Sequence, residues 1–194
     1  MRHVMTIAAL IFLLPSAALA HVGVGPTTGF ANGFVHPLSG LDHVLAMTLV
    51  GLLAVQIGGR AVLALPAAFI GMMIVGGVLG MAHYPMLFVE AGIALSVLVL
   101  GLSVTFSWKP PVAAAVAMTA TFALFHGHAH GSEMPLSASG FTYGVGFVVA
   151  TALLHAAGLA LGFVSRTGRI GVFAVRLAGA ASSLIGAAFL IAST

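Results

Sequence analysis

The stretch FVHPLSGLDHVLAM, residues 34–47, decides how the rest of the chain is interpreted. It places His36, Asp42 and His43 at the start of an apolar run that continues to Ile57. Ionisable side chains are costly to place within a membrane segment, and where they occur there they usually serve a function. The stretch therefore predicts a membrane-spanning helix whose first residues carry a functional site.

The residues between the two histidines predict a break in this helix. His36 and His43 are seven residues apart, which on a straight helix separates them by about 10 Å, too far to bind one ion. Pro37 and Gly40 lie between them, and both weaken a regular helix. We therefore expect residues 36–40 to be irregular and the helix to begin at Leu41. A bend here would bring the first histidine back toward the second and its neighbouring carboxylate.

The composition is that of a polytopic membrane protein. Of 194 residues, 61% are hydrophobic and 5% are charged, and the mean hydropathy is +1.21. A soluble domain has about 25% charged residues. The six Lys and Arg residues are scattered and form no patch for nucleic acid. The chain has no cysteine, which excludes disulfides, thiolate metal sites and iron–sulfur clusters.

The first 20 residues are typical of a secretory signal peptide that is cleaved after Ala18-Leu19-Ala20. Arg2 gives a positive start, and the apolar run that follows, residues 4–14, is too short to span a bilayer easily. The mature chain would begin at His21, and residues 21–194 are expected to form a single domain. The α-amine and imidazole of His21 could chelate a metal together; the alternative is a cleavage junction that happens to precede a histidine.

The remaining chain predicts an all-α fold of six transmembrane helices. Their connections are short, so consecutive helices are expected to be antiparallel neighbours. The predicted spans are residues 41–57, 61–81, 86–106, 111–130, 141–164 and 170–191. Three glycine pairs have the G-x-x-x-G spacing that permits close helix contacts, namely Gly76/Gly80, Gly140/Gly144 and Gly158/Gly162.

The basic residues indicate how the helices are oriented. If signal cleavage leaves His21 outside, then Arg60, Lys109, Arg166 and Arg169 all fall in cytoplasmic loops. The outer loops contain neither Lys nor Arg. This is the positive-inside pattern. It predicts a multi-pass protein of a bacterial inner membrane with its mature N-terminus in the periplasm.

Almost every residue that could bind a metal falls in the outer third of the predicted membrane region. A second cluster, His126, His128 and His130, ends the fourth span. On a helix, His126 and His130 stack at i, i+4, a spacing able to bind one metal, while His128 points elsewhere. Gly127 and Gly131 are expected to loosen this helix end. The alternative is a polar helix end at the membrane surface, where histidines are tolerated.

Other polar groups stand alone in the sequence. Glu90, about one turn into the third span, could bind an ion, pair with a histidine or carry a proton, or it could be an exposed group near the interface. His83 is interpreted as a loop residue. His155 lies deeper, in the fifth span, as either a relay for the ion or a hydrogen-bonded link between helices. Asp42 could cap a helix N-terminus, but capping does not explain the two histidines near it.

The residue types favour a borderline divalent ion. Histidine and carboxylate ligands without cysteine suit nickel, cobalt or zinc, because neutral imidazole binds such ions and a carboxylate offsets their charge. The nine methionines are scattered along the sequence, which favours packing roles over a copper(I) site.

With these motifs quoted, the chain resembles the HupE/UreJ family of nickel/cobalt permeases over essentially its whole length. The resemblance rests on the signal peptide followed by His21, on HPLSGLDHVLAM at residues 36–47, on the six spans, and on FHGHAHGSEMP at residues 125–135. It implies uptake of nickel or cobalt for hydrogenase or urease maturation, with His36, Asp42 and His43 as signature residues. The motif is also similar to the His-(x4)-Asp-His signature of the broader nickel/cobalt transporters. It has one more residue between His36 and Asp42, so identical coordination is not assumed.

The prediction is a secondary transporter, not an enzyme, that imports Ni²⁺ or Co²⁺ from periplasm to cytoplasm. The predicted metal-binding residues are His36, Asp42, His43, His126, His128, His130, His21 and Glu90. The expected partners are a divalent metal ion and the lipid bilayer. Neither nucleic acid nor a prosthetic group is expected. The sequence leaves open whether the protein forms a homo-oligomer. The competing hypotheses are a zinc-dependent membrane hydrolase, a bis-histidine haem carrier, and a metal sensor or accessory binder that transports nothing.

Overall fold

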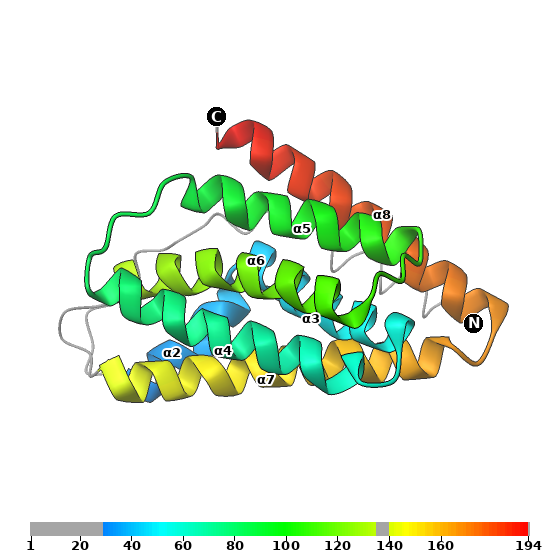
Figure 1. Ribbon diagram of the computed structural model, residues 1–194, viewed down its shortest axis with the longest axis horizontal. Coiled ribbons are helices and arrows are strands. Elements are labelled where there is room, and N and C mark those ends of the chain that lie inside the picture. Colours follow the sequence, from blue (N-terminus) through cyan, green and yellow to red (C-terminus); the bar gives the residue numbers. More distant parts are fainter. Residues whose placement is uncertain (1–28, 135–139, 194) are drawn as a thin grey trace.

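Seven helices and no strand make up the part of the chain that the structure, a computed structural model, describes: residues 29–134 and 140–193 (Figure 1). The predicted all-α fold is confirmed. The bounds of two predicted spans are those of α3 and α4, and the other four differ by at most three residues at either end. The predicted signal peptide and His21 lie outside the described residues. The helices are α2 (Gly29–Ser39), α3 (Leu41–Ile57), α4 (Ala61–Met81), α5 (Val89–Thr105), α6 (Val112–Ser132), α7 (Gly140–Ser165) and α8 (Arg169–Ala192).

The helices have the length and composition of membrane spans. Helices α4, α6, α7 and α8 are long and apolar enough to cross a bilayer, and the bent pair α2–α3 is a fifth candidate. Helix α5 is apolar but has 17 residues, so the predicted count of six is reached only if this shorter helix is included. Large apolar side chains such as Leu63, Phe141 and Ile170 are more than three-quarters exposed. An outer surface of this kind is typical of a multi-pass membrane protein.

Helices α2 and α3 meet at a single residue. Helix α2 continues through His36 and Pro37 to Ser39, so the prediction that residues 36–40 are irregular is wrong. Pro37 lies in the last turn of α2, where its ring can disturb only the end of the helix. The break is Gly40, whose extended backbone (φ −94°, ψ 120°) ends α2 and turns the chain by 81° into α3. The predicted bend is therefore present, but as a sharp joint between two helices.

The main helix contacts join helices that are not consecutive in the chain. Helix α4 packs along α6, α5 along α8, and α7 along both α2 and α3 (Figure 1). In the described ranges, α4 makes no comparable contact with α5, nor α6 with α7. The expectation that consecutive helices are neighbours is therefore wrong for these two pairs. The close fit of small residues, rather than loop length, selects the partners.

Glycines bring α4 and α6 into direct backbone contact. Gly76 and Gly80 of α4 lie against main-chain atoms of α6, and Gly127 and Gly131 of α6 lie against main-chain atoms of α4. A Cβ atom at any of these four positions would overlap the opposite backbone. Gly127 and Gly131 therefore fasten the histidine-bearing end of α6, and the expectation that they loosen it is wrong.

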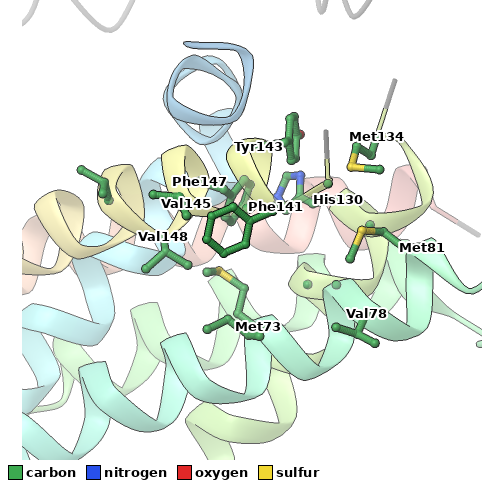
Figure 2. A pocket seen from close by; sticks show the side chains of 17 residues that line it. Met73, Val78, Met81, His130, Met134, Phe141, Tyr143, Val145, Phe147 and Val148 are labelled. Carbon is green, nitrogen blue, oxygen red and sulfur yellow. The ribbon is translucent and has the colours of Figure 1, made fainter. Parts of the chain in front are cut away.

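The other two predicted glycine pairs differ from each other. Gly158 and Gly162 lie against Thr48 and Val55 of α3, and they hold the second half of α7 to that helix. A Cβ at Gly144, in the first half of α7, would meet no atom within 4 Å, so the pair that Gly144 forms with Gly140 is not a close helix contact. A cavity of about 430 Å³ lies here, lined by residues of α4, α6 and α7 (Figure 2).

Candidate metal-binding site

Four histidines from three helices meet at one end of the bundle: His36 of α2, His43 of α3, and His126 and His130 of α6. We call these four the outer cluster. The ring centroid of His130 lies 4.7 Å from that of His36 and 4.2 Å from that of His43, and the His43 and His126 centroids are 5.0 Å apart. His36 is partly exposed, whereas the other three are at most 8% exposed.

Two features of the backbone assemble this cluster. The joint at Gly40 turns α2 across the end of α3, so His36 reaches the same region as His43 and is not displaced along one helix axis. Helix α6 places His126 and His130 one turn apart on the face that meets α3, and the ring of His43 contacts both. The structure thus brings together histidines from both sequence motifs.

The hydrogen bonds of His43 and His126 leave one ring nitrogen of each without a partner. The Nδ1 of His126 donates to the Phe122 carbonyl at 2.9 Å, and the Nδ1 of His43 donates to the Asp42 carboxylate at 2.8 Å. Because these oxygens accept, each Nε2 then carries a lone pair, and both Nε2 atoms are buried without a partner among the described residues. Histidines that bind metals are typically held in this way by a carbonyl or carboxylate behind the ring.

His130 is the centre of the outer cluster. Neither of its ring nitrogens has a hydrogen-bond partner among the described residues, although the ring is buried against Phe147 at a centroid distance of 4.2 Å. One ligand atom each from His130, His36 and Glu133 lie within 4.8 Å of one another. An ion between these three side chains would satisfy nitrogens that are otherwise costly to bury.

All three acidic residues of the chain gather at this end. Asp42 pairs with its histidine neighbour, and the Glu133 carboxylate lies 3.7 Å from the Nε2 of His36, which lowers the pKa of the Glu133 carboxyl below its ordinary value. Glu90 is exposed in the first turn of α5, close enough to interact electrostatically with Asp42 and Glu133. Three carboxylates close to one another raise the local concentration of cations.

Sequence reasoning did not include Glu133 among the metal-binding residues. It is part of the stretch FHGHAHGSEMP, residues 125–135, and follows the second histidine cluster in it. In the structure it directly follows α6, three residues after His130, and its side chain turns back toward His36. The sequence signal that points to Glu133 is the rarity of acidic residues: the chain has three, so each is a candidate for a functional role.

Several predicted residues lie outside the cluster. His128 points away from it, as expected, and its Nε2 donates to the carbonyl of Tyr84 at 2.7 Å, which ties α6 to the loop after α4. His83 is exposed in that loop, and His21 lies outside the described residues. Asp42 does not cap α3, because the N-cap is Gly40 and no side chain makes a capping hydrogen bond there.

Methionines that are scattered in sequence converge beside the cluster. Met73 and Met81 of α4 and Met134, just after α6, line the same cavity as His130 (Figure 2). Met73 belongs to the hydrophobic core and Met134 packs against it, so the packing role expected of the methionines is confirmed for these two. Their thioethers give one flank of the outer cluster a polarizable, otherwise apolar wall.

Gly40→Ala is expected to weaken metal binding without unfolding the protein. A Cβ at Gly40 would lie 2.7 Å from the His43 Nδ1 and 2.8 Å from the Asp42 Oδ1, so it would push this pair apart. The backbone at Gly40 suits any residue, which keeps the disturbance local. We expect the Ni²⁺ affinity of the purified protein, measured by titration calorimetry, to fall about tenfold. Gly71→Ala, where nothing lies within 4 Å, is the control; an unchanged affinity of Gly40→Ala would contradict this reading.

Comparison with known proteins places the whole chain in one family. A family model described as HupE / UreJ protein matches residues 8–189 of the chain. The protein named HupE from Rhizobium leguminosarum bv. viciae is 46% identical over 186 residues, which cover 96% of this chain and 95% of that protein. No solved structure matches the chain.

Proposed function

Because this chain belongs to the HupE/UreJ family, we propose that it is a secondary transporter that imports Ni²⁺ or Co²⁺ from the periplasm to the cytoplasm. The observation that carries the proposal is the outer cluster: four histidines, three of them buried with unpartnered ring nitrogens, close to all three carboxylates of the chain. Imidazole and carboxylate ligands suit these borderline ions. In this proposal the protein supplies the ion for maturation of a metalloenzyme such as a hydrogenase or a urease.

The ion would pass through the outer cluster in two steps. His36, His130 and Glu133 receive it first, because Glu133 and His36 are the most exposed members of this group. It then moves to His43. Asp42 orients this histidine, and the negative charge of the Asp42 carboxylate offsets that of the ion. The buried Nε2 of His126 lies next to that ring and takes over a ligand position.

The remaining predicted residues have supporting roles in this proposal. Glu90 attracts cations to the outer cluster. The mature amino terminus at His21 gathers ions from the periplasm. His128, whose Nε2 is bonded to the Tyr84 carbonyl, positions the end of α6 that carries His126 and His130.

Membrane potential is sufficient to drive this import in a bacterial inner membrane. Each elementary charge that crosses gains about 2.3 kcal/mol per 100 mV, and a divalent ion gains about twice that. Transport also requires that each site release the ion, so several partial sites are more effective than one closed cage. The outer cluster, in which each imidazole lies next to at least one other, offers such a series of partial sites.

Uptake of radiolabelled Ni²⁺ and Co²⁺ by cells that lack their own transporters tests the proposal. Wild type is expected to take up at least one of the two ions, and His43→Ala at equal expression is expected to lose uptake at least about tenfold, because it removes the histidine that links the two steps. His83→Ala, which alters an exposed loop histidine, should keep full uptake. Absence of uptake by well-expressed wild type, together with firmly retained stoichiometric zinc, would instead favour a metal hydrolase.

A further inference from the structure

His155 of α7 is a buried imidazole that the outer cluster does not include. It is 2% exposed, and neither of its ring nitrogens has a hydrogen-bond partner among the described residues. The alternative of a hydrogen-bonded link between helices is therefore not what the structure contains. A buried polar group without a partner costs about 1–3 kcal/mol. Such a group in a folded protein calls for a water molecule, an ion or a functional role.

His155 is the next imidazole inward from the outer cluster. The ring of Phe69 on α4 lies between it and His126, with centroid distances of 5.2 Å to His155 and 5.6 Å to His126. The remaining surroundings of His155 are helix α3, where its own carbonyl lies against Gly51. No acidic residue accompanies it, because all three carboxylates lie at the outer end.

Two other potential ligands lie one helical turn outward on the same pair of helices. The Oγ1 of Thr151 approaches the Sδ of Met73 at 3.6 Å, and both side chains are buried. Thr151 and His155 are four residues apart on α7, and Met73 and Phe69 are four apart on α4. The two side-chain pairs therefore form facing layers about 6 Å apart along the helix axes.

A cavity connects this region with the outer cluster. Met73 and His130 line the same space of about 430 Å³ between α4, α6 and α7 (Figure 2). The space beside the centre of the outer cluster thus extends to the Met73 side chain, which contacts Thr151. This space puts the His130 ring and the Met73 thioether on the surface of one cavity.

We propose that His155, with the Met73 thioether and the Thr151 hydroxyl, forms an inner binding station for the divalent cation between the outer cluster and the cytoplasmic side. This inference rests on the proposed import function. Imidazole and thioether favour Ni²⁺ or Co²⁺ over Mg²⁺ and Ca²⁺, which prefer oxygen ligands. Because no carboxylate offsets the charge there, the ion keeps part of its water and stays briefly. A weak inner station after a stronger outer one is the arrangement that allows release.

A single thiol placed at this position reports directly whether an ion occupies it. The chain has no cysteine, so His155→Cys carries the sole thiol, and a thiolate bound to Co²⁺ gives an intense charge-transfer band in the near ultraviolet. The control is Ser182→Cys, which puts the same thiol at a buried position of α8. We expect the band when Co²⁺ is added to purified His155→Cys and not when it is added to Ser182→Cys.

The outcomes separate the inner station from the proposed function. His155→Cys could bind Co²⁺ at the outer cluster, seen as weak visible bands shared with wild type, and yet show no charge-transfer band. That result would contradict the inner station and leave the proposed import function standing. If wild type itself binds no Co²⁺ and transports neither ion, the proposed function fails and the inner station fails with it.

Uptake measurements supply a second, independent test. His155→Leu is expected to lower Ni²⁺ uptake per folded molecule at least about tenfold while the Ni²⁺ affinity of the outer cluster stays unchanged. His155→Cys, which retains a metal ligand, should recover part of the uptake. A purely structural role for His155 would change the amount of folded protein and not uptake per molecule. Wild-type uptake by folded His155→Leu would overturn the inference.

Discussion

His130→Phe is expected to abolish ion uptake and to leave the protein at least as stable as wild type. His130 contacts two other histidines of the outer cluster and offers two unpartnered nitrogens, so its loss divides the cluster and should reduce uptake about 100-fold. Phenylalanine keeps an aromatic ring against Phe147, and the cavity beside His130 can accept its larger volume. Replacing an unpartnered buried polar group by an apolar one is nearly neutral or stabilising. Radiolabelled Ni²⁺ uptake per molecule and thermal unfolding of the purified protein measure the two effects.

The control for this prediction is His83→Asn. His83 is an exposed histidine on the loop after α4, with a positive φ of 52° that asparagine tolerates. It should keep wild-type uptake, which would show that loss of an arbitrary outer histidine has no effect. Two results would contradict the prediction: normal uptake by His130→Phe, or a loss of uptake that matches a loss of folded protein.

Gly127→Ala is expected to cause a large loss of stability for the addition of a single methyl group. Its Cβ would overlap the Met73 carbonyl and lie 2.9 Å from the Gly77 amide nitrogen, and both are backbone atoms of α4 that cannot rotate away. Helices α4 and α6 would have to separate, at a cost of about 1–3 kcal/mol or more. Because His126 and His128 flank this position, metal binding should fall as well. Thermal unfolding followed by circular dichroism measures the change.

Gly144→Ala is the matched control, since it adds the same methyl group to a helix. Gly144 has nothing within 4 Å, so its Cβ meets no atom, and alanine is favoured over glycine in a helix by about 1 kcal/mol. Its stability should equal or slightly exceed that of wild type. Equal midpoints for Gly127→Ala and Gly144→Ala would show that the α4–α6 contact does not limit stability.

Sequence reasoning located the helices well because their ends carry local signals. The spans now seen as α3 and α4 end at glycine or loop residues that interrupt long apolar runs, and such signals need no knowledge of the rest of the fold. The pairing of helices was predicted poorly for a physical reason. In lipid, every face of a helix can be apolar, so the pattern does not mark which face meets a partner. The partner is chosen by backbone fit at positions such as Gly127 and Gly76.

The candidate site was predictable as a set of residues but not as a geometry. Each of the two histidine motifs is recognisable in the sequence because it places ionisable groups in an apolar segment. That His43 would contact both His126 and His130 depends on where α3 crosses α6, which no local pattern encodes. Glu133 was overlooked for a similar reason, since its approach to His36 follows from the angle between α2 and α3.

The joint at Gly40 has a consequence for how the signature motif can vary in length. Along a continuous helix, one inserted residue rotates everything beyond it by about 100°. An extended residue between two helices does not transmit that rotation, so α2 and α3 keep independent rotational phases. The number of residues between His36 and Asp42 is then set by where α2 stops and not by counting helical turns. A motif with one residue more or fewer can therefore place its first histidine at the same point, provided that α2 rotates about its own axis to compensate.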